Sequence, residues 1–486
     1  MPRKPRILLA TPTYHCGVLE CAGNWMPLAL TFLGGALDRS KFDVVLYDAM
    51  SEGADLDGAV RRIAEINPDL IAVGGYTASF PAALDMLRRV KQMSPRVVTV
   101  CGGVHATFMW RDILAENPFV DYVIVGEGEL PFRDMLNQIF DGGMNGGLPR
   151  GVGARVDGRI VSGGRREFVR DLDTLSPDYG LLDWSIYKYH VIPNSTLGSI
   201  STSRGCSEGC SFCSQQKFWN RTWRAISPDK FEQLARELIE RHGVNVILIP
   251  DERPTTDRGR WEEIIDRMIG LKKDVMFLME TTVVDILRDA DILWKYRKAG
   301  IIHIYVGVEA AGQDRLDDYN KKLSVEESKE ALRLINAADI VSETSFVLGT
   351  PDETPQSIAF TLKQAKRFNP DFAHFLLLTP WPYSDIYAQV KPHIEEWDFS
   401  KYNLVEPVIR PKNMSRDEIF TAVLRCYRDF YMDKLSEVRA LKNDFKREYM
   451  MRSMKVMMHN SFLKSHLLRL GELPRHISAH SVHEAV

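Results

Sequence analysis

The first 150 residues alternate short apolar runs with amphipathic stretches, a pattern typical of a parallel sheet covered by helices. We expect strands at residues 6–10, 44–47, 70–74, 97–101 and 122–125. Each run is followed by Gly, Thr, Ser or Asp, and ligands of such open sheets bind outside the carboxyl ends of the strands. The loops after these strands are therefore the candidate ligand site of residues 1–150.

The same alternation returns over residues 196–400. Strands are expected at 198–203, 246–250, 275–280, 303–308, 345–348 and 374–378, and helices at 228–242, 258–270, 285–299, 324–338 and 354–368. Repeated strand–helix units of this kind predict a second α/β domain with a barrel-like sheet. Functional groups of such barrels gather at the carboxyl ends of the strands.

The segment between the two domains, residues 151–195, is predicted to be a connector without chemistry. It opens with a hairpin signal, because the runs 152–156 and 159–162 flank Asp157-Gly158. A stretch containing Pro, Asp and Gly follows and ends at Asp183-Trp184.

Residues 401–486 are predicted to form a C-terminal helical region. Apolar residues at three- and four-residue spacing indicate helices at 417–439 and 443–469. The second helix carries an apolar stripe made of Met451, Met454, Met458 and Phe462. Core packing is the favoured interpretation of this stripe; an adaptable lid over a flat apolar ligand is the alternative, and a membrane-surface helix is weaker.

Composition narrows the classes of protein. The 486 residues suffice for about three domains, and a content of 45% apolar and 26% charged residues is ordinary for a soluble globular protein. A net charge of −3 disfavours a nucleic-acid partner. No apolar run approaches the roughly 18 residues of a transmembrane helix, and the basic N-terminus lacks a signal-peptide core. We expect a cytoplasmic protein.

Three cysteines carry the strongest chemical signal. Cys206, Cys210 and Cys213 lie in the run Arg-Gly-Cys-Ser-Glu-Gly-Cys-Ser-Phe-Cys. A four-iron cluster held by three thiolates keeps one iron open for an outside ligand. Structural zinc requires four ligands, but the next cysteine is Cys426 and the nearby run has no histidine, so we favour a 4Fe-4S cluster over zinc. The remaining cysteines, Cys16, Cys21, Cys101 and Cys426, are expected to be small buried hydrophobes.

The C-x3-C-x2-C spacing, with Phe212 before the last cysteine, resembles the signature of the radical S-adenosylmethionine enzymes. The resemblance implies a partial (β/α)6 barrel over residues 196–400 and an open iron chelated by S-adenosylmethionine. It also implies cleavage of the sulfonium to a 5'-deoxyadenosyl radical, and an electron donor such as flavodoxin or ferredoxin. Contacts to S-adenosylmethionine are expected from Phe212, Asp251, Glu252, Glu280 and Glu309, although acids at strand ends equally serve as helix caps or ion pairs.

The N-terminal loops together resemble a Rossmann-like cobalamin-binding domain. The resemblance assigns to cobalamin the residues Thr11, Tyr14, His15, Asn24, Thr77, Ser79, Gly102, Gly103, His105, Gly126, Glu127, Gly128 and Glu129. Glycines let backbone amides approach a bulky ligand, and small hydroxyls can bond its amide side arms. The motif Asp-x-His-x-x-Gly does not occur in the sequence, so no histidine ligand to cobalt is expected, with His15 as the one exception considered.

Further segments resemble one group within this family, the anaerobic magnesium-protoporphyrin IX monomethyl ester oxidative cyclases of bacteriochlorophyll biosynthesis. These segments are residues 14–15, 22–25, 102–108, 180–184, 213–219, 251–255 and 378–385. The resemblance implies a tetrapyrrole substrate and an anaerobic oxidation that closes the fifth ring. A cobalamin-dependent radical methyltransferase shares every cofactor motif and stays open as the alternative. A tRNA-modifying enzyme and a corrinoid carrier are disfavoured by the charge and by the intact cysteines.

No catalytic acid or base is assigned from the sequence. His303 and His374 are candidates for a base or a magnesium ligand, with a core role favoured for both. Aromatic residues that could stack on a porphyrin, or simply pack, are Phe218, Trp219, Trp223, Trp381 and Tyr383.

Overall fold

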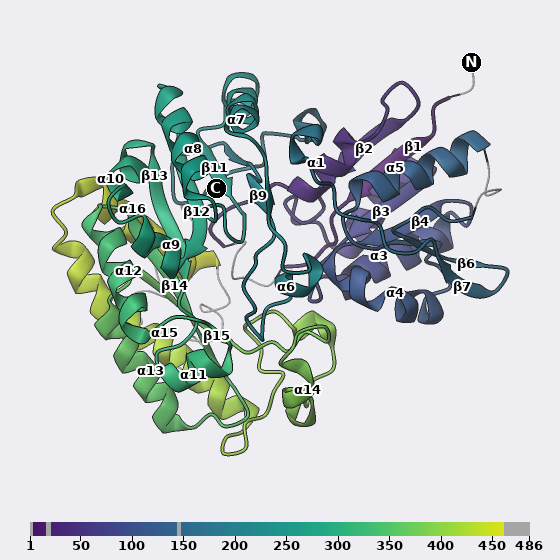
Figure 1. Ribbon diagram of the computed structural model, residues 1–486. Helices are drawn as coiled ribbons and strands as arrows, with labels where there is room; N and C mark the ends of the chain where they lie inside the picture. The colour runs from purple at the N-terminus through teal and green to yellow at the C-terminus, as the bar shows by residue number, and fades with distance from the viewer. Residues whose placement is uncertain (1–2, 16–20, 143–146, 461–486) are drawn as a thin grey trace.

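The computed structural model describes residues 3–15, 21–142 and 147–460. Its N-terminal part is an α/β unit whose sheet has the strand order β2-β1-β3-β4-β5-β6-β7 (Figure 1). The five predicted strands are present and parallel: β1 (Arg6–Ala10), β2 (Asp43–Tyr47), β3 (Leu70–Gly74), β4 (Val98–Gly102) and β5 (Tyr122–Ile124). Their residues are mostly apolar because helices cover both faces of the sheet.

The hairpin after residue 150 belongs to this sheet. β6 (Val152–Val156) pairs antiparallel with β5, and β7 (Arg159–Ser162) pairs antiparallel with β6. The connector expected over 151–195 therefore begins only after β7, because these two strands hydrogen-bond to the sheet edge. The helices of the unit are α1 (Leu28–Gly35), α2 (Leu56–Ile66), α3 (Phe80–Met93), α4 (Val104–Glu116) and α5 (Glu129–Asn137), the last followed by a π-helical turn at Gln138–Gly142.

The second unit is an open barrel of six parallel strands in the order β15-β14-β13-β12-β11-β8. The strands are β8 (Leu197–Ser199), β11 (Val246–Ile249), β12 (Met276–Thr282), β13 (Ile301–Gly307), β14 (Val341–Leu348) and β15 (Phe372–Leu377). The main helices around them are α7 (Pro228–His242), α8 (Arg258–Gly270), α9 (Val283–Arg288), α10 (Leu293–Lys298), α12 (Val325–Ala337) and α13 (Pro355–Phe368). This architecture confirms the predicted partial barrel.

The helix expected at 285–299 is two helices, α9 and α10. Asp289 lies at the break, where its buried carboxylate accepts a hydrogen bond from the Tyr296 hydroxyl at 2.7 Å and pairs with Arg288. The turn therefore satisfies a buried charge that a continuous helix would leave among apolar side chains.

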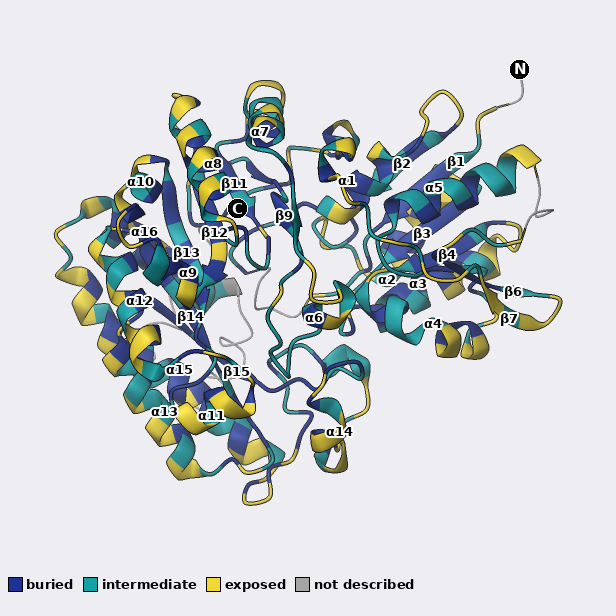
Figure 2. Ribbon diagram, viewed as in Figure 1, coloured by how far each residue is buried: buried dark blue, intermediate teal, exposed yellow. Residues whose placement is uncertain are grey.

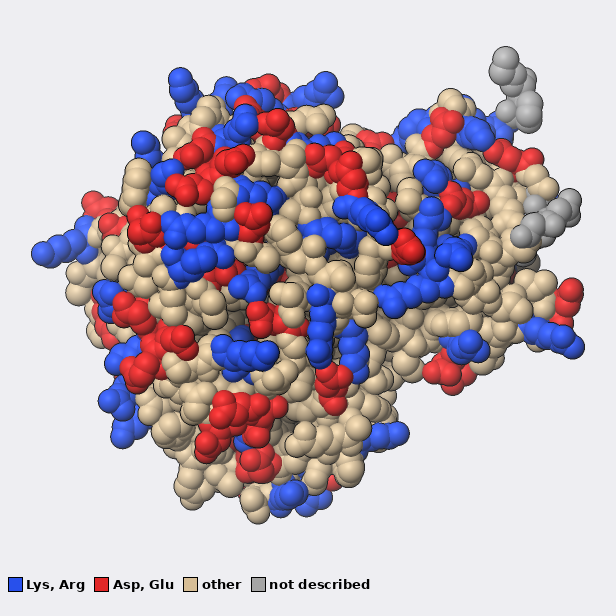
Figure 3. Space-filling view, viewed as in Figure 1, with Lys and Arg blue, Asp and Glu red and all other residues tan. Residues whose placement is uncertain are grey.

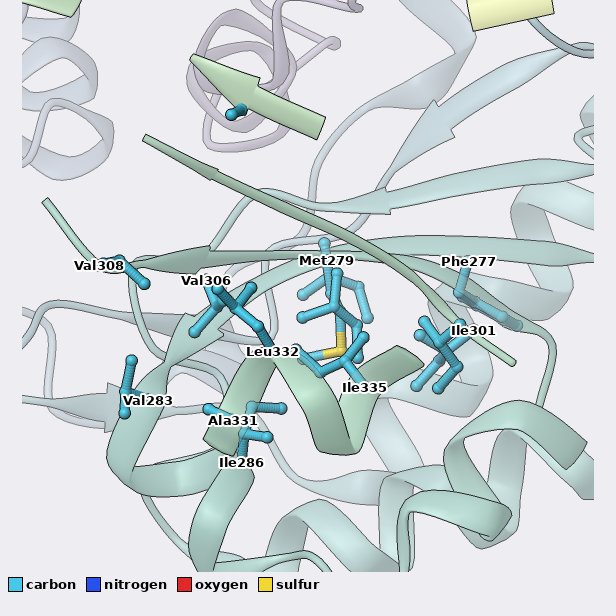
Figure 4. Close-up of a cluster of buried hydrophobic side chains, with 14 of the residues drawn as sticks. Phe277, Met279, Val283, Ile286, Ile301, Val306, Val308, Ala331, Leu332 and Ile335 are labelled. Carbon is cyan, nitrogen blue, oxygen red and sulfur yellow. The ribbon is translucent and has the colours of Figure 1, made fainter. Parts of the chain in front are cut away.

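The main hydrophobic core lies between the barrel strands and their helices. Figure 4 shows Met279 of β12 beside Leu332 and Ile335 of α12, and Phe277 beside Ile301 of β13; all five are buried. Dark blue strands surrounded by partly exposed helices in Figure 2 show the same layering. Because alternate residues of a strand point to opposite faces, the other set lines the inside of the barrel.

The amino end of the barrel is closed by C-terminal and N-terminal segments together. A second apolar cluster joins the first residues of several strands, such as Leu197 and Val246, to Tyr449 and Met450 of α16 (Asp444–Asn460). Trp25, from the loop after β1, packs against the same cluster. The site must therefore lie toward the carboxyl ends of the strands.

The C-terminal region is helical in its described part, with α15 (Arg416–Arg439) and α16. Met451 and Met454 pack against the cluster at the closed end of the barrel, and Met458 packs against the main core. These contacts support the core-packing interpretation of the stripe; Phe462 lies outside the described residues. The short helices of the connections are α6 (Gln215–Phe218), α11 (Gln313–Asp318) and α14 (Tyr387–Val390), and a short strand pair is formed by β9 (Ser203–Arg204) and β10 (Arg224–Ala225).

The face of the molecule seen in Figure 3 carries charges of both signs. Lys and Arg side chains alternate with Asp and Glu over the face seen in Figure 3. Among the described helices, none combines the length and the apolar character that crossing a bilayer requires.

A buried ion pair fastens α16 to the barrel and gives a stability prediction. Lys446 Nζ lies 2.7 Å from Asp371 Oδ2, and both residues are buried. In Lys446→Met the carboxylate stays buried without its cation, so we expect the free energy of unfolding to fall by about 3–5 kcal/mol in urea denaturation. Lys455→Met, on an exposed position of the same helix, should change it by less than about 0.5 kcal/mol. Equal effects of the two substitutions would refute this account.

Candidate functional site

The three predicted cluster cysteines lie in one loop that β9 and β10 hold together at its base. Gly205 opens the loop with φ +96°, and a Cβ there would lie 2.1 Å from the Thr222 carbonyl oxygen, so only glycine fits. Burial raises the pKa of each thiol, that of Cys213 to about 12. The charge of Cys206 acts on both Cys210 and Cys213, which places the three thiols near one another.

No group of three His, Cys, Asp or Glu side chains in the described part of the chain surrounds a single metal ion. In an iron–sulfur cluster each cysteine binds a different iron, so its three thiolates stand farther apart than the ligands of one ion.

Asp251, at the end of β11, holds the start of the cysteine loop. Its Oδ2 accepts hydrogen bonds from the Thr202 amide (2.9 Å) and hydroxyl (2.6 Å) and from the Ser203 amide (2.7 Å) and hydroxyl (3.0 Å). Burial raises the pKa of Asp251 to about 6 despite these bonds. The carboxylate predicted to contact S-adenosylmethionine is therefore occupied by backbone and hydroxyl donors of the loop.

The next two residues hold other parts of the loop. Glu252 accepts from the Trp219 indole at 3.0 Å and from the Gly205 amide at 3.3 Å. Arg253 pairs with Glu208 inside the loop at 2.7 Å and with buried Asp285 at 2.7 Å. Arg253 was missed from the sequence, since nothing near it in the chain identifies its partners.

The far side of the loop rests on the end of the barrel. The Phe212 ring meets Tyr319 edge-on at 5.1 Å, and the Ser211 amide donates to the Tyr319 carbonyl at 2.9 Å. Gln216 donates to the Cys210 carbonyl and to Asp385, both at 2.8 Å. Phe212 thus packs behind the loop, and Asp385 joins residues 213–219 to residues 378–385.

From the surroundings of Glu280 and Tyr76 we infer a hollow between the two units. The Glu280 side chain is exposed, yet burial raises its pKa to about 8, with the charges of Glu252 and Glu343 adding to the effect. Tyr76 is 70% exposed, but it too is surrounded by protein. This burial raises the pKa of Tyr76, and the charges of Glu252 and Glu280 raise it further. Side chains that are accessible and yet surrounded by protein line an interior space. The hollow is thus reached from the N-terminal loops and from the barrel.

Glu309 stands at the end of β13 with the unusual backbone angle φ +68°. Its carboxylate pairs with Lys321 at 2.9 Å and accepts from the Ser345 hydroxyl at 3.0 Å. Its charge acts on Cys210, so the predicted contact residue lies beside the cluster loop.

The third-strand loop and the Gly-Gly turn are held by a buried hydroxyl network. Thr77 bonds to Tyr383 at 2.7 Å and to Nδ1 of His105 at 3.2 Å. Burial lowers the pKa of His105 to about 4, so its imidazole is neutral. Ser79 accepts from the Tyr76 amide at 3.1 Å. Thr77, Ser79 and His105 therefore shape the loop that presents Tyr76, and Tyr383 fixes this loop to the barrel.

The loop after β1 is tied to other segments. Thr11 donates to buried Asp48 at 2.8 Å, and Tyr14 donates to the Ser400 carbonyl at 2.7 Å. Asn24 donates to the Ile186 carbonyl at 2.9 Å. His15 is exposed at the end of the described part of this loop, and Cys16 lies outside the described residues.

Glycines form the open edge of the N-terminal unit. Gly103 is exposed and adopts φ +97°, with the Gly75 carbonyl oxygen only 2.7 Å from where a Cβ would lie. Gly126 adopts φ +85° and has open space around the missing side chain. Gly102 and Gly128 flank the same edge. At Gly126 the bare backbone lies beside open space and suits the close approach of a large ligand, whereas a Cβ at Gly103 or Gly128 would meet Gly75 or Leu33 of the same unit.

The carboxylates of Glu127 and Glu129 form a clamp between the two units. Arg204 of β9 pairs with Glu127 at 2.9 Å and with Glu129 at 2.6 Å, and Arg224 of β10 pairs with Glu127 at 2.9 Å. Against the effect of burial, both carboxylates raise the pKa of Arg204. These acids thus hold the base of the cysteine loop against the N-terminal unit, and their side chains are not available to a ligand.

The aromatic candidates are mainly structural. Trp219 donates to Glu252, Trp223 donates to the Arg253 carbonyl at 3.0 Å, and Tyr383 stacks on Phe108 at 4.4 Å. Phe218 meets Trp219 edge-on at 4.7 Å, and the Trp381 carbonyl accepts from Ser384 at 2.8 Å. Tyr76 is an exposed aromatic residue that the sequence did not single out, although its neighbours Thr77 and Ser79 were assigned to cobalamin.

Comparison with protein families places two domains on the chain. The B12 binding domain matches residues 14–136, and the radical SAM superfamily matches residues 200–365. These matches cover the two units described above.

Curated relatives extend over almost the whole chain. The anaerobic magnesium-protoporphyrin IX monomethyl ester cyclase of Rubrivivax gelatinosus is 35% identical over 94% of this chain and 83% of its own length. The enzyme of the same name from Cereibacter sphaeroides is 36% identical over 95% of this chain and 75% of its own. A hopanoid C-3 methylase of Methylococcus capsulatus is 24% identical over 83% of this chain and 76% of its own length.

A solved structure shares the fold. The cobalamin-dependent S-adenosylmethionine radical enzyme OxsB, with aqua-cobalamin and S-adenosylmethionine bound, superposes with a TM-score of 0.72 at 16% identity. The match covers 97% of this chain and 74% of that one.

The hydrogen bonds of Asp251 give a prediction about the cluster. In Asp251→Asn a neutral amide replaces the carboxylate, so the donors of Thr202 and Ser203 bond to an uncharged and weaker acceptor. We expect a loss of about 2–4 kcal/mol of local stability and less than half of the wild-type iron after anaerobic reconstitution, measured as iron per polypeptide. Asp291→Asn, which removes only an exposed pair with Arg258, is the control and should bind iron normally. Normal iron content in Asp251→Asn would contradict the role of this carboxylate.

The raised pKa of Glu280 predicts a dependence of stability on pH. The folded protein keeps the Glu280 proton up to about pH 8, whereas the unfolded chain loses it near pH 4.5. Between these values the folded state binds more protons, so the contribution of Glu280 to stability falls as the pH rises. In the protein without cofactors, Glu280→Gln should gain stability over the wild type between pH 5 and pH 8 in thermal denaturation. A difference that does not change with pH would show that Glu280 titrates normally.

Proposed function

The chain belongs to the cobalamin-binding radical S-adenosylmethionine enzymes, and from this premise we propose that it is an oxygen-independent oxidative cyclase. Its substrate would be magnesium-protoporphyrin IX monomethyl ester, whose methyl propionate side chain is closed onto the neighbouring meso carbon. The reaction removes six electrons and takes the keto oxygen from water. Its product would be the isocyclic ring of protochlorophyllide.

The proposal depends mainly on the sequence identity of 35–36% to two cyclases over 94–95% of the chain. The described contacts are consistent with it. Residues 213–219 and 378–385 meet through Asp385, and Tyr383 reaches Thr77 in the N-terminal unit. These contacts bring segments that resemble cyclases together and join them to the N-terminal unit, which supports the proposal.

The enzyme uses a 4Fe-4S cluster, S-adenosylmethionine and cobalamin. When bound, these groups supply a 5'-deoxyadenosyl radical, which takes hydrogen from an unactivated carbon, and a second redox-active metal. Cys206, Cys210 and Cys213 would hold the cluster. Their thiols are shielded by protein, and three residues at the end of β11 fix the loop around them.

The hydrogen bonds and positions of the five residues predicted to contact S-adenosylmethionine reduce that set to three. Asp251 and Phe212 position the cysteine loop, whereas Glu280 faces the hollow and Glu309 and Glu252 lie beside the loop. We assign Glu280, Glu309 and Glu252 to the S-adenosylmethionine side of the hollow. Carboxylates there can accept hydrogen bonds from an amine and from ribose hydroxyls.

On the cobalamin side the backbone at Gly102, Gly103, Gly126 and Gly128 would meet the corrin. Thr77, Ser79 and His105 would support this edge through their hydrogen bonds. Glu127 and Glu129 would hold the two units together through their ion pairs with Arg204. Tyr76 offers an exposed ring on which a flat macrocycle can stack. An electron donor such as flavodoxin or ferredoxin and a cytoplasmic location complete the proposal.

A radical methyltransferase is the second candidate, because a methylase relative at 24% identity aligns with 83% of the chain. The two reactions differ in mass and co-product. Methyl transfer adds one methyl group and forms S-adenosylhomocysteine, whereas ring closure adds no carbon.

Anaerobic reconstitution tests the function. The protein, loaded with cluster and cobalamin and supplied with S-adenosylmethionine and a reductant, should convert magnesium-protoporphyrin IX monomethyl ester to a product with a red-shifted absorption. Mass spectrometry should show oxygen from labelled water in the new ring. Cys210→Ala, which removes one cluster ligand, should lower product and 5'-deoxyadenosine by at least about 100-fold.

Two results would contradict the proposal. A substrate heavier by one methyl group, together with S-adenosylhomocysteine, would favour the methyltransferase. Abundant 5'-deoxyadenosine with an unchanged porphyrin would exclude this substrate.

A further inference from the structure

Three polar side chains form a cluster inside the barrel, which we call the lumen triad: His303 of β13, Glu343 of β14 and His374 of β15. Each is the third residue of its strand. The residues that follow them in the chain are Ile304, Thr344 and Phe375. All three are buried, and Ile304 and Phe375 belong to the main core between the strands and the helices. By the alternation of strand side chains, the triad lies on the concave face of the barrel.

Glu343 is the centre of the triad. One carboxylate oxygen contacts Nε2 of His374, and the other lies 3.0 Å from Nε2 of His303. Although burial acts in the opposite direction, the two imidazoles hold the pKa of Glu343 well below its usual range. A carboxylate between two histidines can stabilise an imidazolium when either ring takes up a proton.

The two histidines are not equivalent. Nδ1 of His303 is bonded to the Tyr449 hydroxyl at 2.8 Å, and Tyr449 is in turn bonded to Tyr189 at 2.5 Å. The nitrogen of His303 that faces Glu343 is buried and lacks hydrogen-bond alignment. For Nδ1 of His374, by contrast, the described residues supply no hydrogen-bond partner, and its side chain is 19% exposed against 11% for His303.

The triad and the cluster loop face the same space. Two residues further along β13 and β14, on the same face, Tyr305 bonds to Ser345 at 2.6 Å. Ser345 donates to Glu309 at 3.0 Å, and Glu309 pairs with Lys321, whose charge acts on Cys210. A row of polar side chains thus lies along the inner wall between the triad and the cysteine loop. The substrate carbon that the radical oxidises would lie along this row, where a water molecule beside His374 can reach it.

We propose that His374 is a catalytic residue of this site, the proton acceptor that activates the water from which the product oxygen derives. Glu343 and His303 are positioning residues, which hold the imidazole and balance its charge. This assignment rests on the proposed function and gives it the acid–base group that the sequence did not supply.

The proton transfer is balanced without a redox partner. An O–H bond of the water breaks and an N–H bond forms at Nδ1 of His374. The electron pair of the broken bond stays on oxygen, which would attack the carbon after the first two-electron oxidation has made it electrophilic. The 5'-deoxyadenosyl radical would take the hydrogen atom in that oxidation, and a second one-electron acceptor such as cobalamin would take the remaining electron. The imidazolium is paired with Glu343 and later returns its proton to solvent.

The test compares product with radical formation in the anaerobically loaded enzyme. His374→Gln keeps a polar side chain of similar size but cannot accept a proton, so we expect product to fall at least about 100-fold. Formation of 5'-deoxyadenosine should stay within about threefold of wild type, and so should the Kd for the magnesium porphyrin. Added imidazole should restore part of the product in His374→Ala.

Glu343→Gln serves as a second variant, because the isosteric amide preserves the packing if His374→Gln fails to fold. It should lose about tenfold in product while radical formation continues. His393→Gln is the control, since His393 lies on a short 3-10 turn at Lys391–His393 outside the barrel and should leave all readouts unchanged.

The outcomes separate the inference from the function on which it rests. Wild-type enzyme that makes no cyclised product refutes the proposed function. Active wild type with an equally active His374→Gln refutes only the role of His374. Weaker porphyrin binding with unchanged turnover of the bound substrate would indicate a magnesium ligand and would also overturn the proposal.

Discussion

The buried carboxylate of Asp251 is the constraint on which the site depends. Its Oδ2 accepts four hydrogen bonds from Thr202 and Ser203, the two residues that lead into the cysteine loop. A loop that must present three thiols has few apolar residues with which to pack itself. Its geometry is therefore set by polar contacts from neighbouring strand ends, and Glu252 and Arg253 extend the same support to the rest of the loop.

The second constraint is the fixed relation between the two units. The clamp of Glu127 and Glu129 on Arg204 and Arg224 is almost fully buried, so breaking it would leave charges without partners inside the protein. Tyr383 and Thr77 form a second link on the other side of the hollow. Because Arg204 is also part of β9, the clamp that joins the units also fixes the base of the cysteine loop.

The sequence predicted the elements well and the roles of polar residues less well. Strands such as β1 and β3 were recognisable because an apolar run between turn residues has one structural meaning. An acidic residue at a strand end can bind a ligand, cap a helix or form an ion pair, and only the identity of its partner shows which role it has. Asp251 bonds to Thr202 at a separation of 49 residues, Arg204 to Glu127 at 77, and Thr77 to Tyr383 at 306. Such partners cannot be read from local pattern, so Asp251, Glu127 and Glu129 were expected at ligands and instead hold loops.

The central claim is that the three cysteines and the glycine edge of the N-terminal unit face one hollow, with Glu280 and Tyr76 between them. A crystal structure of the reconstituted enzyme, with anomalous maps at the iron and cobalt edges, tests this most directly. The account predicts iron density at Cys206, Cys210 and Cys213 and a cobalt peak on the hollow side of Gly102 and Gly103. A cobalt peak on the opposite side of the N-terminal sheet, or iron held by other residues, would contradict it.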